Sequence, residues 1–189
     1  MLLRYMLAVS LLAVNSIAWA DSIDVNLSND VAQFQYLASS GRVGQGVSEF
    51  HMGFLYNNSS NAMVDVGLTV SNSDDRSSIA TFGIGVKAIA ATVGKNANAV
   101  ALALGGQIRI APAADKKFGI VAQGYLAPDI VTFGDADRFV QTGVRLEYEI
   151  MPQAAAYVGY RKTKFGLNTV PSTDVVLEEG AHVGVKFAF

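Results

Sequence analysis

The 189-residue chain contains no cysteine, only four prolines and little charge. The absence of cysteine excludes disulfide bonds, thiolate metal sites, a thiol nucleophile and a lipidated N-terminal cysteine. Charged residues make up 16% of the chain, against about 25% in a typical soluble domain. Hydrophobic residues make up 51%, and the net charge of −2 gives no basic surface for nucleic acid. The low charge indicates that part of the outer surface faces something other than water.

The first twenty residues have the three parts of a secretory signal peptide. Arg4 supplies the positive charge, residues 5–14 form a short apolar run, and Ala18-Trp19-Ala20 is a small-x-small cleavage site. The apolar run is too short to span a bilayer, which argues against a membrane anchor. We therefore predict a cleaved signal peptide over residues 1–20 and a single domain over residues 21–189, located outside the cytoplasm.

Apolar and polar residues alternate with a period of two along the rest of the chain, as in β-strands. Near the C-terminus, Val183, Val185 and Phe187 share one face, while His182 and Lys186 share the other. Further alternating segments centre on residues 50–56, 64–70, 82–88, 100–110, 118–126, 140–150 and 153–164. With their flanking residues, the segments run to about nine to fourteen residues, whereas soluble strands average about five or six and bilayer-crossing strands need ~9–11.

The residues on the two faces distinguish a membrane barrel from a soluble sandwich. One face carries large apolar side chains, and the other carries glycine, alanine, threonine, glutamine and charges of both signs. A soluble sandwich would need more charge to cover its outside, and the mature chain has no run of ~18 apolar residues for a transmembrane helix. We predict an all-β, closed antiparallel transmembrane β-barrel with apolar faces toward lipid and small and polar residues filling the lumen. A soluble lipocalin-like carrier is the structural alternative.

The connections and the N-terminal part decide the number of strands. Short connections at residues 111–116 and 151–153 alternate with longer ones at 127–138 and 165–179, which is typical of periplasmic turns and outer loops. Residues 94–98 are expected to form a further outer turn. Residues 23–27 and 32–36 alternate on opposite parity around a turn signal at Ser28-Asn29-Asp30. If both pieces join the wall, the barrel has ten strands; if they form a capping hairpin, it has eight. We favour ten.

Several motifs of the mature chain carry a family resemblance. They are Asn29-Asp30-Val31-Ala32-Gln33-Phe34, the stretch from Ala127-Pro128-Asp129 to Gly134-Asp135-Ala136-Asp137-Arg138, Arg145-Leu146-Glu147-Tyr148, and Glu179-Gly180-Ala181-His182. With these motifs the chain resembles the YfaZ family of small outer-membrane proteins of Gram-negative bacteria. The resemblance implies an outer-membrane location and implies no established reaction or transported substrate.

The last strand also resembles a signal for outer-membrane assembly. Its apolar residues Val183, Val185, Phe187 and Phe189 end the chain in the pattern recognised by the barrel-assembly machinery. The partners implied are that machinery during biogenesis, then outer-membrane lipid and lipopolysaccharide. We expect a monomer that binds no nucleic acid.

A set of ionisable residues falls on the face predicted to line the lumen. They are Glu49, His51, Asp65, Lys87, Arg109, Arg145, Glu147, Glu149, Arg161, His182 and Lys186. Because an isolated buried charge is very costly, we expect them to pair across the interior and form a salt-bridged plug. The alternative is a narrow polar channel whose charges set ion preference. The diameter decides between them, because eight strands are mostly filled by side chains and larger rings open.

Two other groups of residues suggest chemistry only weakly. Asp135 and Asp137, with Asp129 and Arg138 nearby in a predicted outer loop, lack the six or more oxygen ligands of a Ca²⁺ site. We expect Asp135 to cap a turn and Arg138 to pair locally or contact lipopolysaccharide phosphate. His182 follows a loop containing Ser172, Thr173 and Asp174, a thin basis for a hydrolase or acyltransferase.

The favoured function is that of a non-enzymatic outer-membrane β-barrel with a structural or narrow-pore role in the cell envelope, without cofactor or metal. The second hypothesis is a specific channel for a small anionic or zwitterionic solute that uses Arg109, Arg145 and Arg161. An outer-membrane hydrolase or acyltransferase is the third.

Overall fold

The computed structural model describes residues 21–72, 79–93, 97–112, 115–168 and 173–189. The predicted signal peptide lies outside these residues. The strands within them are β1 Ser22–Ser28, β2 Val31–Val43, β3 Gly46–Asn57, β4 Ala62–Ser71, β5 Ala80–Val93, β6 Ala97–Ile110, β7 Phe118–Ala127, β8 Thr132–Gly134, β9 Ala136–Met151, β10 Ala154–Leu167 and β11 Thr173–Ala188. A 3₁₀ turn, η1 (Asp129–Val131), precedes β8. Among the described residues, no helix has the length and apolarity to cross a membrane.

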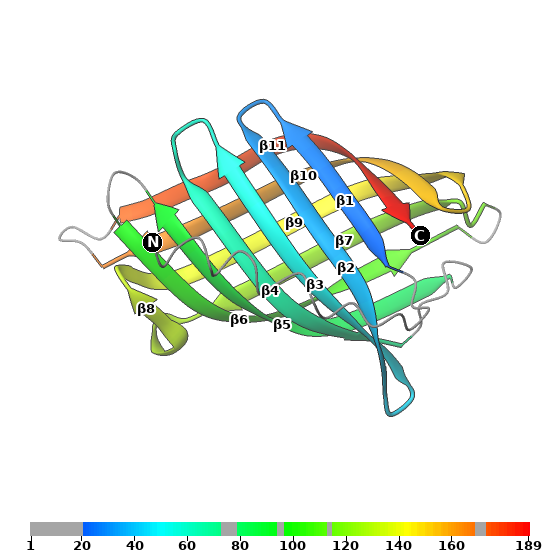
Figure 1. Cartoon of the computed structure of the whole chain (residues 1–189), viewed down its shortest axis with the longest axis horizontal. Coiled ribbons are helices and arrows are strands. Elements are labelled where there is room, and N and C mark those ends of the chain that lie inside the picture. Colours follow the sequence, from blue (N-terminus) through cyan, green and yellow to red (C-terminus); the bar gives the residue numbers. More distant parts are fainter. Residues whose placement is uncertain (1–20, 73–78, 94–96, 113–114, 169–172) are drawn as a thin grey trace, which may run out of the picture.

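The strands form one antiparallel sheet that closes on itself (Figure 1). Around the ring the order is β1-β2-β3-β4-β5-β6-β7-β9-β10-β11, and β1 pairs with β11 to complete it. The three-residue β8 pairs with β6 beyond the end of β7, so the wall has ten full strands. The prediction of a closed antiparallel barrel is confirmed, and of the two strand numbers ten is the one observed.

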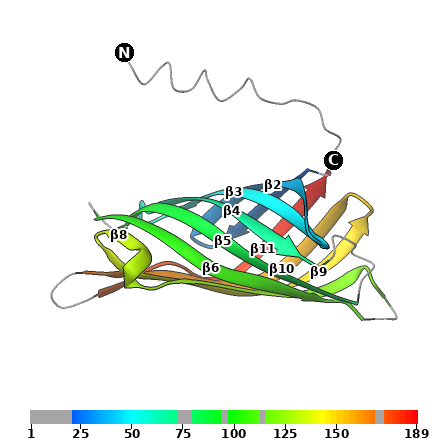
Figure 2. The same ribbon diagram turned by 90° about the horizontal axis from the view of Figure 1, so that it is seen from below.

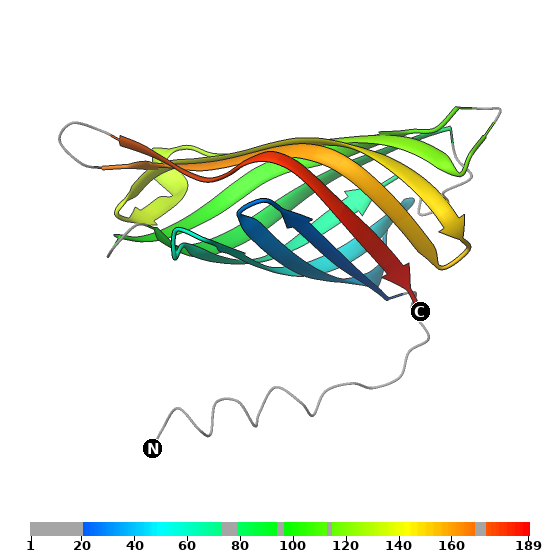
Figure 3. The ribbon, with the colours of Figure 1, turned by 90° about the horizontal axis from the view of Figure 1, so that it is seen from above.

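Ten strands form because the N-terminal pieces join the wall. Val25 of β1 lies opposite Phe34 of β2 on one side and Val185 of β11 on the other. The turn between β1 and β2 is held by Ser28, whose Oγ accepts a hydrogen bond from the Val31 backbone N–H at 3.1 Å. Figure 3 shows this short hairpin beside the much longer β11.

Both ends of the described chain lie at one end of the barrel, here called the terminal end. The backbone N–H of Asp21 donates to the Phe189 carbonyl at 3.2 Å, and the N–H of Phe189 donates back at 2.9 Å. The opposite end, called the far end, carries the turn between β1 and β2 and the turn between β3 and β4. Figure 2 shows the strands wrapped obliquely around the axis that joins the two ends.

The outer surface of the wall is apolar. Phe54 of β3 is 47% exposed, Leu104 of β6 is 66% exposed and Val183 of β11 is 59% exposed, whereas their neighbours in sequence point inward. Large exposed apolar residues occur on every full strand of the ring. This is the surface that the hydrocarbon core of a bilayer requires, with each backbone group paired inside the closed sheet.

The interior of the far end is apolar, so the prediction that small and polar residues fill the lumen is wrong there. Six inward side chains on six strands, each at most 2% exposed, make up what we call the apolar plug: Leu55, Met63, Val93, Phe139, Phe165 and Leu177. The rings of Phe139 and Phe165 lie 4.8 Å apart and are tilted by 52°. Apolar side chains fill a dry space without needing hydrogen-bond partners, which buried polar groups there would lack.

Three predicted outer connections are shorter than expected. Within residues 127–138, the short strand β8 (Thr132–Gly134) forms and β9 already begins at Ala136. Residues 165–179 do not form one long polar loop, because β10 continues to Leu167 and β11 begins at Thr173. The register of β10 with β11 shifts between Thr163 and Lys164, so the consecutive residues Leu177 and Glu178 of β11 are both buried and the simple alternation of that strand is interrupted. Likewise, residues 97 and 98 lie within β6 and not in the outer turn expected over 94–98.

Opposite faces of two neighbouring strands give a direct test of this packing. Ala101 of β6 points inward and is fully buried, while Ala90 of β5 lies on the exposed outer surface. Ala101→Leu should lower the free energy of unfolding by about 1–3 kcal/mol because it overfills a packed interior. Ala90→Leu should leave it unchanged or raise it, because the larger side chain contacts lipid. Urea unfolding of the barrel in lipid vesicles measures both, and an equal loss for both variants would contradict the assignment of the faces.

Candidate functional site

The interior of the barrel contains three layers between its two ends. The apolar plug lies at the far end, buried ionisable residues lie in the middle, and a cavity lies at the terminal end. Every side chain in these layers comes from the inward face of a strand, so the period of two in the sequence places it.

The first buried polar cluster centres on Arg161 of β10, and we call it the Arg161 network. Its guanidinium makes two hydrogen bonds to the Glu178 carboxylate, at 2.5 and 2.8 Å, and donates to Asn26 Oδ1 at 3.0 Å and to Gln33 Oε1. Asn26 Nδ2 also donates to Gln33 Oε1 at 3.0 Å. All four residues are at most 4% exposed. The two-point contact with Glu178 is the strong geometry for an arginine–carboxylate pair. The network as a whole joins β10 and β11 to the hairpin of β1 and β2.

A second cluster surrounds the buried Asp65 of β4. Its Oδ1 lies 3.6 Å from His51 Nε2 and 3.8 Å from Lys87 Nζ. The same lysine donates to Gln141 Oε1 at 3.2 Å and lies 4.2 Å above the Tyr125 ring. The carboxylate therefore has a cation beside it in a dry interior, which offsets part of the cost of burying its charge.

Glycines on neighbouring strands make room for these side chains. His51 lies opposite Gly67, where a Cβ atom would come within 2.5 Å of the imidazole. Asp65 lies opposite Gly53, where a Cβ atom would come within 2.4 Å of the carboxylate. Bulky polar groups thus lie across from glycine, and the wall can hold them inside a narrow lumen.

A third cluster leads from the middle layer toward the terminal end. Arg145 donates to Asp24 Oδ2 at 3.3 Å, and its Nη2 lies 2.7 Å from Glu147 Oε1. Arg109 Nε lies 3.7 Å from the other oxygen of Glu147. The Tyr157 hydroxyl donates to Asp24, and the Arg145 guanidinium stacks 4.7 Å from the Tyr157 ring. Charges of opposite sign therefore alternate along this cluster.

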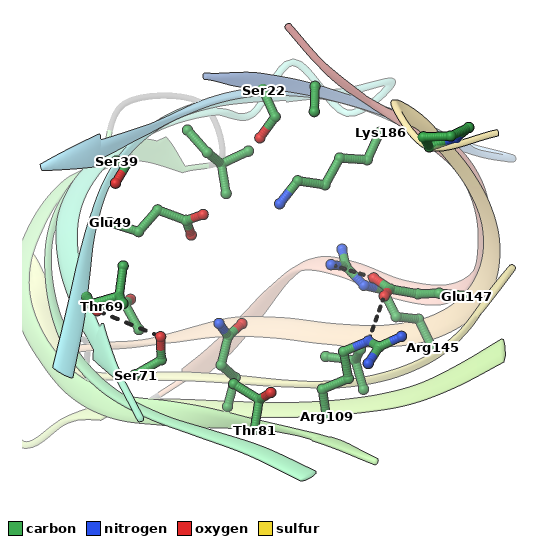
Figure 4. A pocket seen from close by; sticks show the side chains of 16 residues that line it. Ser22, Ser39, Glu49, Thr69, Ser71, Thr81, Arg109, Arg145, Glu147 and Lys186 are labelled. Carbon is green, nitrogen blue, oxygen red and sulfur yellow. Dashed lines mark hydrogen bonds and ion pairs between the residues drawn. The ribbon is translucent and has the colours of Figure 1, made fainter. Parts of the chain in front are cut away.

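The cavity follows this cluster and has a volume of about 350 Å³. Figure 4 shows Arg109, Arg145 and Glu147 on one side of it, with Glu49 and Lys186 pointing into it from other parts of the wall. Its further polar lining consists of Ser22, Ser39, Thr69, Ser71, Thr81 and Gln107. Because Ser22, Pro152 and Ala188 also line it, the cavity reaches the terminal end of the barrel.

The residues predicted to line the lumen divide between the middle layer and the cavity. Buried in the interior are His51, Asp65, Lys87, Arg161 and His182. Lining the cavity are Glu49, Arg109, Arg145, Glu147 and Lys186. Glu149 is half-buried on the same face of β9 as Glu147.

Interior polar residues that sequence reasoning missed include Asp24, Asn26, Gln33, Tyr157 and Glu178. Asp24 and Asn26 share the inward face of β1 with Ser22, so the period of two would have found them once β1 was placed in the wall. Glu178 follows the register shift of β10 and β11, which hides its direction.

The predicted outer acidic loop lies at the far end. Asp129 is exposed in η1, and Asp135 Oδ2 accepts a hydrogen bond from the Asn98 backbone N–H at 2.9 Å. Asp137 is half-buried beside Arg138. No group of three or more potential metal-binding residues occurs in the described part of the chain.

Arg138 pairs with Asp174, which lies on the outside of β11 beyond the apolar surface. Arg138 Nη2 and Lys164 Nζ donate to the two Asp174 oxygens at 2.8 and 2.9 Å. These hydrogen bonds lower the pKa of Asp174 from 3.8 to about 2. Their contribution to stability is therefore present above pH 3.8 and is lost as the pH falls through about 2.

Two of the residues considered for catalysis, His182 and Asp174, lie apart. His182 is buried, with its ring 5.9 Å from that of Tyr157. Asp174 is exposed and accepts hydrogen bonds from Arg138 and Lys164. Ser172 lies outside the described residues, as does the side chain of Thr173.

Comparison with known proteins identifies the family. The family model described as "YfaZ precursor" matches residues 2–189. The chain belongs to the YfaZ family. The resemblance predicted from the motifs is thereby confirmed over nearly the whole chain. The comparison with curated proteins gives no match.

Solved structures similar to this YfaZ-family chain include several barrels. A structure titled "KdgM porin" and one of the NanC porin are each 12% identical, each with a TM-score of 0.45, and each alignment covers 90% of this chain and 99% of the other. OmpT, an outer membrane protein of Vibrio cholerae, is 10% identical with a TM-score of 0.39, and the alignment covers 89% of this chain and 64% of that one.

The Arg161 network should be necessary for the stability of this YfaZ-family barrel. Arg161→Ala leaves the Glu178 carboxylate buried without its cation, which should cost about 3–5 kcal/mol. The double variant Arg161→Met with Glu178→Leu removes both charges and should recover most of that loss. Lys162→Met breaks an exposed pair with Glu179 and serves as a control whose stability should stay close to that of the wild type, because water screens an exposed ion pair. Urea unfolding in lipid vesicles gives these values, and a double variant as unstable as Arg161→Ala would contradict the explanation.

Proposed function

We propose that this YfaZ-family protein is a non-enzymatic integral protein of the Gram-negative outer membrane, with a structural role in the cell envelope and a lumen closed to solutes. The observation that carries the proposal is the apolar plug, whose six side chains are at most 2% exposed inside the barrel. The apolar outer surface supports the membrane location, since such a surface is stable against hydrocarbon and not against water.

The chain would cross the membrane with its terminal end toward the periplasm. The predicted signal peptide exports the chain to that compartment, and both ends of the mature chain lie at one end of the barrel. The far end carries outward charges, including the pair of Arg138 with Asp174. Charges of this kind belong above the hydrocarbon, where they meet water and lipid headgroups.

A continuous water path would have to pass two obstacles. The plug presents a dry apolar constriction, which opposes wetting and ion passage. Below it, the Arg161 network joins four strands with hydrogen bonds, and all of its residues are buried. Opening the lumen would break these contacts and expose the plug to water, so the closed form is favoured.

The second candidate function is a specific channel for a small anionic or zwitterionic solute. The cavity at the terminal end favours it, because Arg109 and Arg145 line that cavity. Arg161, the third arginine of the hypothesis, is held in its network and does not line the cavity. Such a channel would require the plug to move when solute arrives.

Conductance in planar bilayers separates the two candidates. The wild-type protein should give no current above leak. The triple variant Phe139→Ala, Phe165→Ala and Leu177→Ala removes half of the plug and should give discrete current steps. Replacing the outward residues Phe54, Leu68 and Phe82 with alanine is the matched control and should give none, since these side chains do not fill the lumen.

Two controls show that a change in conductance comes from a folded barrel in the membrane. Heat-modifiable migration on gels must show that each variant is folded, and the wild type must need detergent for extraction. Steady wild-type current that is lost in Arg109→Ala and Arg145→Ala variants would favour the channel. Release of the wild type by salt or osmotic shock alone would contradict the membrane location.

A further inference from the structure

Two charged side chains that line the cavity at the terminal end have no ion-pair partner in the described part of the chain. Of the ionisable residues that line it, Arg109, Arg145 and Glu147 form ion pairs with one another or with Asp24. Glu49 and Lys186 form neither a hydrogen bond nor an ion pair within the part of the chain that the structure describes. Each points into the cavity from its own section of the wall (Figure 4).

The two charges have opposite sign and lie on different strands. Glu49 belongs to β3 and Lys186 to β11, and β2 and β1 separate these strands in the ring. Neighbouring strands lie about 4.8 Å apart, so the two side chains start from well-separated points of the wall. No ion pair joins them within the described ranges of the chain, and a half-buried charge without a partner gains from binding an opposite one.

The total charge around the cavity restricts the ligand further. Arg109, Arg145 and Lys186 supply three cations, and Glu49, Glu147 and the adjoining Asp24 supply three carboxylates. A simple anion would pair with Lys186 and leave Glu49 uncompensated, and a simple cation would do the reverse. A neutral molecule that carries both an ammonium and a carboxylate group can pair with Glu49 and Lys186 at the same time.

We propose that this cavity binds a small peptide-like zwitterion of dipeptide size, with its ammonium group at Glu49 and its carboxylate at Lys186. The volume of about 350 Å³ is at the lower end of the ~300–1,000 Å³ of small-molecule sites. The terminal charges of a dipeptide lie farther apart than those of a single amino acid, which suits two partners on separated strands. The serine, threonine and glutamine side chains of the lining supply hydrogen bonds to its central amide.

The inference goes beyond the proposed function and does not depend on it. A barrel with a closed lumen can hold this ligand, because the cavity reaches the terminal end without passing the plug. Absence of binding would leave the conductance result untouched, and a conducting barrel would leave the binding result untouched.

Isothermal titration calorimetry on the folded mature chain in detergent tests the proposal. The probe is glycylglycine, compared with N-acetylglycylglycine, which lacks the ammonium group, and glycylglycinamide, which lacks the carboxylate. Glycylglycine should bind saturably, and each blocked analogue should bind at least about tenfold more weakly because it leaves one wall charge without a partner.

Variants identify the two side chains that carry the binding. Glu49→Gln and Lys186→Met should each weaken glycylglycine binding by about tenfold or more. Their controls are Glu179→Gln and Lys162→Met, which make the same substitutions at an exposed pair on the outside of the barrel, and they should bind like the wild type. Heat-modifiable migration confirms that all four variants are folded.

Three results would overturn the proposal. The first is no saturable glycylglycine binding at millimolar concentration to the folded wild type. The second is equal affinity for glycylglycine and either blocked analogue. The third is unchanged binding by folded Glu49→Gln and Lys186→Met variants.

Discussion

A strand surrounded by hydrocarbon has no water to satisfy its backbone N–H and C=O groups, so its sheet must close. In this YfaZ-family chain the closure depends on β1, seven residues that pair with β11 from Ser22 opposite Ala188 to Ser28 opposite His182. Beyond the end of β1, the Asn57 side chain donates to the Leu177 carbonyl of β11 at 2.8 Å. This side-chain hydrogen bond pairs a β11 carbonyl at a level that the hairpin of β1 and β2 does not reach.

Closure creates an interior that must be filled, and this chain fills it in two ways. Apolar side chains fill the far end, where no partner groups are needed. In the middle, ionisable side chains are buried with their partners, as Arg161 is with Glu178. Near the terminal end of the described barrel the interior is not filled, and there the structure leaves a cavity with charges of both signs. The function proposed for the barrel and the ligand proposed for the cavity both follow from where the interior is filled.

The sequence was sufficient for the features that depend on alternation alone. The alternation along residues 140–150 places Val144 outside and Arg145 inside, as the structure has them. At the far end the alternation continues, since Leu55 lies on the same face as Gly53 and Phe139 on the same face as Gln141; the prediction failed there because it assigned every large apolar side chain to the lipid-facing surface. Which charges meet was also hidden, since Asp24 and Arg145 are 121 residues apart and only the ring order brings them together.

The central claim is that apolar side chains face lipid while the opposite faces line a filled interior. The chain has no cysteine, so single cysteines introduced along residues 51–56 of β3 can carry a spin label in vesicles. Collision rates with lipid-soluble oxygen should be high for labels at Met52, Phe54 and Tyr56 and low at His51, Gly53 and Leu55. High oxygen collision rates at the second set, with rapid collision of a water-soluble nickel complex at the first, would contradict the account.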